Sequence, residues 1–443
     1  MTDTYPRLSK ADRDALESAR ETMDRKMARL RDVVPCVVDL SIREGTLPAP
    51  YGHTLEDKRE LLRLAREFGF TDIAIAAYFD YENVDEVFAR ELKESGDSMD
   101  GFFCNLSLVQ TEADRPLEPS YAMERIKQAG IPNLLALVEI WPSTLKRRGR
   151  TYDDLFRDIE VNIAYLRDVI LPPTDKRRGR IYFRFLDIFD AWDEDPELVV
   201  RVLKLLETLP IQAVIYEDVR GTHFPFQTAE LVKLIRRFTP PPRLILVHPH
   251  SGNGLEDAST VEAVLAGADG VWAGLTPHAA QGAHGSSAML LSNLARAGNP
   301  YVAELFRLER LMDICDAMSR IHMGEPIHKD HPVIGERAYH YIDPAFIQTD
   351  RPCDLAPETI GQAVGWRVTP AWSSPYALGK RLTQLGHPSE IADNDELIRT
   401  MRMIMSEANI AGKRIEFDLP EEMAKLIEAA RARMAAGQET AAE

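Results

Sequence analysis

The stretch VPCVVDLSIREGTLPAPYGHTLEDKRELLRLAREFGFTDIAIAA, residues 34–77, decides the expected fold, because it reads as a strand, a helix and a second strand. Residues 34–40 form a compact apolar run, typical of a buried parallel strand. Thr54, followed by acidic residues, predicts the start of a helix that Gly69 would end. Residues 72–77 are again strand-like. The segment therefore predicts one β–α–β unit of an α/β protein.

The same alternation continues along the chain, so that it covers roughly 265 residues in all, close to the length typical of a barrel of this kind. Helical segments separate most of the strand-like runs, and one of them has Asp195 as its expected N-cap and Pro196 at its first position. The further strand-like runs are residues 102–108, 133–140, 181–185, 212–216, 243–247 and 270–273. Eight strands in alternation with helices predict a (β/α)8 TIM barrel.

The alternation ends after residue 299. One long amphipathic helix is expected over residues 301–322, and further helices over residues 393–409 and 420–434. We therefore expect three parts in this α/β protein. They are an N-terminal helical extension (residues 1–33), a TIM-barrel catalytic domain (34–299) and an α-helical C-terminal subdomain (300–443).

Composition excludes several classes of protein. The chain has 443 residues, of which 45% are hydrophobic, so it can bury a full core. Its formal net charge of −17 argues against nucleic acid or an anionic membrane as a partner. Four scattered cysteines without CxxC spacing suggest free thiols in a reducing compartment. The polar N-terminus and the absence of a long apolar run predict a cytoplasmic protein.

Polar residues gather where the predicted strands end, which is where TIM-barrel active sites form. Asp39-Leu-Ser-Ile-Arg-Glu-Gly45 closes the first strand, and Gly45 would allow a sharp turn that exposes Arg43 and Glu44. His248 and His250 follow the seventh strand and share one strand face. Two histidines and a carboxylate are a ligand set for a divalent cation.

Each feature also has an ordinary structural reading. Adjacent Arg and Glu often form a surface ion pair, and paired histidines often only hydrogen-bond to the protein. Gly282-Ala-His-Gly-Ser286 follows the eighth strand, where its small residues would let a ligand approach the backbone, but it also fits a loop that closes the barrel. The agreement of the three features in position favours a metal site.

These motifs resemble those of the DRE-TIM metallolyase superfamily, which includes homocitrate synthase, isopropylmalate synthase and hydroxymethylglutaryl-CoA lyase. The resemblance rests on D-x-S-I-R-E-G from Asp39, on His248-x-His250, and on Asp218-x-x-Gly221 after the sixth strand. Beyond the barrel, residues 331–340 and 385–413 resemble the helical subdomain of the synthases. The glutamate at position 44 is most similar to homocitrate synthases.

The resemblance implies a metal-dependent condensation. Glu44, His248 and His250 would hold Mg, Mn, Zn or Co, and Arg43 would polarise the acceptor carbonyl. Asp39 would orient Arg43. The expected activity is an acyltransferase that joins acetyl-CoA, or another acyl-CoA, to a 2-oxo acid.

The resemblance also suggests further site residues. Arg184 would clamp a distal substrate carboxylate, although a structural ion pair explains it equally well. Asp218 and Ser286 are candidates for substrate binding. In the synthases a histidine of the helical subdomain acts as the base in a partner subunit's barrel. His340 is the nearest match, so a homodimer is expected.

Several departures from the family pattern bear on the substrate. The glutamine usual after Gly45 is absent, Ser251-Gly252 replaces Asn-Asp, and the second strand lacks the common glutamate. Thr276 stands where the lyase has its cysteine, which argues against that type of lyase. A carbon–carbon lyase or aldolase remains the alternative, and a binding protein built on an inactive barrel is the least favoured interpretation.

Overall fold

The computed structural model describes residues 8–171, 179–280, 282–347 and 355–442. The chain divides into two compact units, Met1–Pro326 and Ile327–Glu443. The first unit includes the barrel and the helices up to residue 323, whereas the sequence suggested a boundary after residue 299. The three-part division remains our proposal.

The first unit is a closed barrel of eight parallel strands, each paired with its neighbours in chain order. The barrel closes where β1 pairs with β8, in the register Cys36↔Gly270 to Asp39↔Ala273. A Cβ atom at Gly270 would lie 1.8 Å from the Cys36 carbonyl oxygen, so this contact requires glycine. The predicted TIM-barrel fold is confirmed. The strands are β1 (Cys36–Asp39), β2 (Asp72–Ala77), β3 (Phe102–Ser107), β4 (Asn133–Val138), β5 (Arg180–Phe185), β6 (Ala213–Asp218), β7 (Leu244–Pro249) and β8 (Gly270–Ala273).

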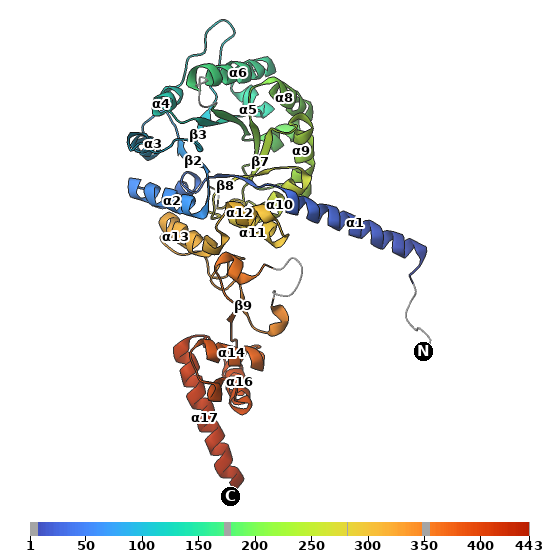
Figure 1. The fold of residues 1–443 in the computed structure, drawn as a ribbon, viewed down its shortest axis with the longest axis vertical. Helices are drawn as coiled ribbons and strands as arrows, with labels where there is room; N and C mark the ends of the chain where they lie inside the picture. Colours follow the sequence, from blue (N-terminus) through green and yellow to red (C-terminus); the bar gives the residue numbers. More distant parts are fainter. Residues whose placement is uncertain (1–7, 172–178, 281, 348–354, 443) are drawn as a thin grey trace. The chain divides into compact units, whose positions relative to one another are not determined.

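Helices surround the strands in the first unit (Figure 1). Side chains rather than a pore fill the barrel interior, with Phe103, Tyr182 and Trp272 as its largest members. The helices are α1 (Lys10–Asp32), α2 (Leu55–Phe68), α3 (Val84–Glu94), α4 (Tyr121–Ala129), α5 (Pro142–Arg147), α6 (Tyr152–Tyr165), α7 (Ile188–Glu194), α8 (Pro196–Thr208), α9 (Pro225–Phe238), α10 (Glu256–Ala266), α11 (Ser287–Arg296), α12 (Pro300–Leu305) and α13 (Leu311–Met323). Short helical turns lie at η1 (Glu44–Thr46), η2 (Leu166–Ile170) and η3 (Leu308–Arg310).

The cap of α2 follows the sequence signal. Thr54 accepts a hydrogen bond from the Asp57 backbone N–H, and the Asp57 side chain accepts one from the Thr54 backbone. Gly69 ends the helix in the left-handed region with φ 116°. Residues Leu61, Ala65 and Phe68 face the core, as the apolar spacing predicts.

Replacing Thr54 by alanine removes one half of this capping box. We expect the free energy of unfolding to fall by about 1 kcal/mol, because a backbone N–H in the first turn of α2 loses its acceptor. Urea unfolding followed by circular dichroism measures the change. Thr54→Ser keeps the hydroxyl and should stay close to the wild type. Equal losses in both variants would show that the hydroxyl is not what stabilises α2.

The prediction of a single long helix over residues 301–322 is wrong. The chain forms α12, then the turn η3, then α13, with extended backbone at Phe306. The ring of Phe306 lies 5.7 Å from that of Phe68 and 5.7 Å from that of Phe70, and the Arg307 N–H donates to the Phe68 carbonyl at 2.8 Å. Packing against the end of α2 therefore breaks the helix, although the local sequence permits one.

The second unit is mainly helical and has its own core. Leu378, Leu397, Met401 and Leu426 are buried within it. Its elements are β9 (His340–Tyr341), η4 (Pro344–Phe346), η5 (Pro357–Ile360), β10 (Gly365–Trp366), α14 (Pro375–Gln384), α15 (Ser389–Ala392), α16 (Asp395–Ile410) and α17 (Pro420–Ala442). The predicted α-helical C-terminal region is confirmed. Across both units, none of the described helices is long and apolar enough to span a bilayer.

Candidate metal centre

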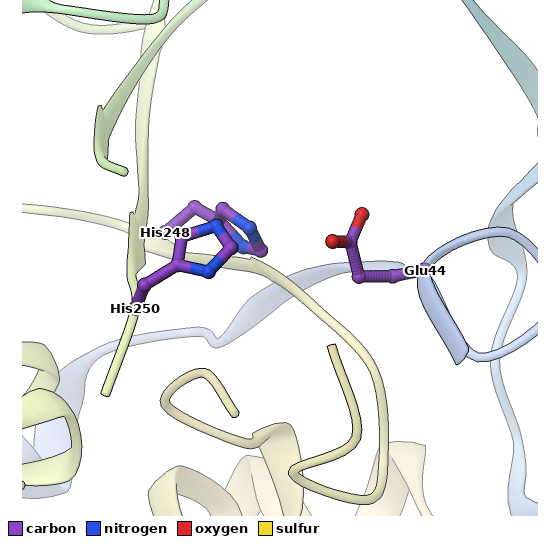
Figure 2. A group of neighbouring side chains, drawn as sticks. All are labelled: Glu44, His248 and His250. Carbon is purple, nitrogen blue, oxygen red and sulfur yellow. The ribbon is translucent and has the colours of Figure 1, made fainter. Parts of the chain in front are cut away.

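Three side chains converge at one end of the barrel. One ligand atom from each of Glu44, His248 and His250 lies within 4.8 Å of the other two, and all three residues are buried. Figure 2 shows the two imidazoles facing the Glu44 carboxylate across a short gap. The carboxylate comes from η1, in the loop that follows β1, and the histidines lie at the end of β7 and just after it. The sequence-predicted ligands are therefore neighbours in the fold.

The backbone explains how the two histidines meet. His248 lies in β7 and His250 follows its last residue, so their side chains leave the same face of the chain. The ring centroids are 4.7 Å apart and the ring planes are nearly perpendicular, at 89°. Pro249 between them is paired with Asp218 at the end of β6. The spacing thus gives two ligands that a small cation could contact together.

His248 has one ring nitrogen that is hydrogen-bonded and one that is available to a ligand. Its Nδ1 donates to the Trp272 carbonyl oxygen at 2.6 Å, since a carbonyl can only accept. Its Nε2 is buried and has no hydrogen-bond partner among the described residues. Burial, followed by the neighbouring His250 and His284, holds the pKa of His248 well below its ordinary value. A neutral imidazole with a free lone pair fits a divalent cation.

His250 has partners on both nitrogens. Its Nδ1 lies 3.1 Å from the Ala280 carbonyl oxygen, and its Nε2 lies 3.4 Å from Glu217 Oε1. Burial alone would lower the pKa of His250, but its hydrogen bond to Glu217 and the charge of that residue raise it. A bound cation would compete with Glu217 for Nε2 or share the pocket with it.

Glu44 is 2% exposed and sits in positive surroundings. It forms an ion pair with Arg43, and its Oε1 accepts a hydrogen bond from the Ala280 N–H at 3.4 Å. Burial would raise the pKa of Glu44, but the charges of Arg43, then His284 and His250, lower it below the ordinary value. The carboxylate is therefore held ionised, as a metal ligand must be.

A second buried ion pair lies beside the ligands. Arg184 in β5 donates to Glu217 Oε2 at 2.7 and 2.8 Å, and its guanidinium lies 4.2 Å from the centre of the Trp272 ring. It also donates to Asn105 at 3.2 Å. Glu217 thus joins Arg184 to His250. A substrate carboxylate at Arg184 would have to compete with this pair.

Sequence reasoning overlooked Glu217 and His284. Ala213 and Ile215 point into the barrel, so the alternation of β6 turns Glu217 inward as well, and this signal could have found it. His284 lies in the loop after β8, where it pairs with His250 as an isolated bridge and accepts from the Gly274 N–H at 3.3 Å. The sequence pattern of Gly282–Ser286 indicated a close approach of backbone to a ligand, and it gave no role to the imidazole of His284.

Asp39, Asp218 and Ser286 are buried, and the structure engages each in local hydrogen bonds. Asp39 accepts from the Ser41 hydroxyl at 2.7 Å, whereas Arg43 pairs with Glu44. Burial raises the pKa of Asp39 to about 7. The other two organise their own loops.

Asp218 accepts from the backbone N–H groups of Gly221 and His223, at 3.0 and 3.1 Å. Ser286 caps α11 by accepting from the Met289 N–H at 3.2 Å. These contacts shape the loops after β6 and β8. A role for either residue in substrate binding remains a proposal.

Gly45 serves a different purpose from the one expected. Its φ is not in the left-handed region, and Glu44 is buried rather than exposed. A Cβ atom at Gly45 would lie 2.3 Å from Cε1 of His322, so glycine makes room for that ring. His340, the expected base, lies in β9 of the second unit and is half-buried.

Comparison with known proteins supports the motif assignment. The chain is 26% identical over 152 residues to the probable 2-isopropylmalate synthase of Archaeoglobus fulgidus, a match that covers 34% of this chain and 29% of that protein. The chain thus matches less than a third of the length of this relative. A search of family models finds no match.

Solved structures with the same fold include two HMG-CoA lyases. The lyase of Acinetobacter baumannii, in complex with coenzyme A and 3-methylmalate, has a TM-score of 0.52 and 16% identity, covering 67% of this chain and 93% of that one. The lyase of Bacillus subtilis has the same TM-score and identity, and 95% of its chain is covered. The predicted resemblance to the DRE-TIM metallolyases is confirmed.

A TIM barrel can carry many unrelated activities, because the chemistry depends on residues at the strand ends. At 16% identity, the two lyase structures establish the fold of this chain and no activity. The site residues therefore have to be argued from their own geometry.

Proposed function

We propose that the chain is a divalent-metal-dependent acyltransferase that condenses an acyl-CoA, acetyl-CoA in the first instance, with a 2-oxo acid. The observation that supports it most directly is the convergence of Glu44, His248 and His250 beside Arg43. These three side chains would hold the cation, which when bound supplies a Lewis acid for the carboxylate and ketone oxygens of the acid.

The protein's own residues would perform the remaining steps. A base takes a proton from the acyl methyl carbon, the resulting carbanion bonds to the ketone carbon, and the ketone oxygen becomes an alkoxide that is then protonated. Water cleaves the thioester and releases the free thiol of coenzyme A. Arg43, placed beside Glu44, would donate to the oxygen on which negative charge develops.

Other assignments belong to the same proposal. Asp39 would stabilise the turn that carries Arg43 through Ser41, and Arg184 would meet the distal carboxylate of the acid. His340 would be the base, supplied to the barrel of a second copy in a homodimer. Burial, then the charge of Arg381, lowers the pKa of His340, which favours the neutral form that a base requires.

The testing experiment is a thiol-release assay. With acetyl-CoA and a panel of 2-oxo acids, we expect thiol release with one acid, its loss on chelation, and its return when Mg²⁺, Mn²⁺, Zn²⁺ or Co²⁺ is added back. Size-exclusion chromatography with light scattering measures the expected dimer.

Two other results would redirect the assignment. Cleavage of a hydroxyacyl-CoA or a 4-hydroxy-2-oxo acid without added coenzyme A would favour the lyase or aldolase. Absence of metal-dependent turnover with every substrate would contradict both enzymatic proposals.

A further inference from the structure

Lys58 is a buried lysine close to the candidate metal centre. It lies in α2 and is 0% exposed. Its Nζ donates to the Ile42 carbonyl oxygen at 2.7 Å and to the Thr46 hydroxyl at 3.1 Å, and forms an ion pair with Asp85 at 2.7 Å. The ammonium group has three donors, so each donor has a partner.

These contacts bracket the turn that carries the proposed ligand. Ile42 and Thr46 flank Arg43, Glu44 and Gly45, so one ammonium group holds the turn at both ends. Asp85 also accepts from the Ala77 N–H at 3.0 Å, which ties the arrangement to the end of β2. The position of the Glu44 backbone is thereby linked to a neighbouring strand.

The hydrogen bonds continue beyond the turn. Thr46 Oγ1 lies 2.6 Å from His53 Nδ1, and His53 Nε2 lies 3.1 Å from His322 Nδ1. Lys58 can only donate, and in the described part of the chain His53 Nδ1 is the one acceptor that the Thr46 hydroxyl reaches. With Nδ1 of His53 as the acceptor of this proton, His53 carries its own proton on Nε2 and donates it to Nδ1 of His322.

The chain of hydrogen bonds ends at His322, whose ring lies against the turn that carries Glu44. His322 lies in α13, is 1% exposed, and its ring occupies the space where Gly45 lacks a side chain. Burial, then His53 and His278, holds its pKa well below the ordinary value, so the ring is neutral. The turn with Glu44 is thus held by Lys58 on one side and packed against an imidazole on the other.

We propose that Lys58, acting through Thr46, His53 and His322, positions Glu44 for the cation. This inference rests on the metal centre of the proposed function, and it assigns these residues a positioning role rather than contact with substrate. An apolar residue could fill the space of Lys58 without the desolvation of a buried ion pair, so stability alone does not explain the lysine.

The test measures metal affinity rather than turnover. Mn²⁺ binding to the full-length protein is followed by electron paramagnetic resonance of the free ion. Lys58→Met should weaken Mn²⁺ binding about 10- to 100-fold, the loss typical when residues that orient a metal ligand are changed. Thr46→Val keeps the side-chain shape and should also weaken binding. If Lys58→Met does not fold, Mn²⁺ binding by Thr46→Val tests the proposal in its place.

Lys93→Met is the matched control. Lys93 lies in α3 and donates to the Gln128 carbonyl oxygen, on the outside of the barrel and away from the turn. Its removal should leave Mn²⁺ affinity unchanged.

Nitrogen-15 spectra of the histidines give a second readout. His322 should carry its proton on Nε2 in the wild type, and Thr46→Val should change this pattern.

The possible outcomes separate the two proposals. Wild-type affinity in folded Lys58→Met and Thr46→Val, or an Nδ1 proton on His322 in the wild type, would overturn the positioning network. A wild type that binds no Mn²⁺ would overturn the metal centre and the network together. If Mn²⁺ binds and both variants weaken it, yet no 2-oxo acid supports thiol release, the network stands and the acyltransferase proposal fails.

Discussion

The Glu44→Gln protein is expected to lose Mn²⁺ binding and thiol release while keeping its fold. Glutamine has the shape of glutamate but no negative charge, so the two imidazoles would face the cation without a carboxylate. We expect affinity to fall by more than about a hundredfold, beyond the loss typical of residues that only orient a ligand. Mn²⁺ titration and the thiol-release assay measure the two effects, and circular dichroism checks the fold.

Glu139→Gln is the matched control for this substitution. Glu139 follows β4, at the same end of the barrel, where it pairs with Arg148. Loss of its charge should leave Mn²⁺ affinity unchanged.

His250→Ala should behave like Glu44→Gln, because it removes another of the three proposed ligands. Turnover retained by both Glu44→Gln and His250→Ala would refute the site.

The largest effect on stability is expected at Glu217. Glu217→Leu leaves the Arg184 guanidinium buried without its anionic partner, since Arg184 is 5% exposed and its Nε and Nη2 both donate to Glu217. Removal of one partner of a buried ion pair typically lowers the free energy of unfolding by about 3–5 kcal/mol. Urea unfolding monitored by circular dichroism gives the change.

A double variant separates the lost ion pair from the changed packing. Arg184→Met combined with Glu217→Leu removes both charges and should recover most of the lost stability, because no charge is then buried alone. If the double variant is as unstable as the single one, the ion pair is not the cause. His250 also loses its contact with Glu217 in both variants, so its contribution cancels in the comparison.

Most of the barrel could be predicted from the sequence because its strands are apolar runs with clear ends. Residues 72–77 and 270–273 match β2 and β8, and β1, β6 and β7 differ from their predicted ranges by a few residues. The break between α12 and α13 could not be predicted, because it depends on Phe306 packing against Phe68. That contact is tertiary and leaves no local signal.

The candidate site was predictable only in part. Glu44, His248 and His250 stand out because strand ends bring distant residues together, which a one-dimensional pattern can indicate. Asp218 and Ser286 satisfy neighbouring backbone groups, a use that their positions alone do not reveal. The network from Lys58 to His322 joins α2 to α13, and no spacing in the sequence connects them.

The indole of Trp272 is a fluorescent probe inside the barrel. Trp272 is fully buried, its ring centroid is 4.5 Å from that of His248, and the Arg184 guanidinium lies over its face. Fluorescence from an indole is sensitive to charge and to paramagnetic quenchers at such short range. Emission from this tryptophan would therefore change when a cation such as Co²⁺ reaches His248, and would give an optical signal for occupancy without any substrate.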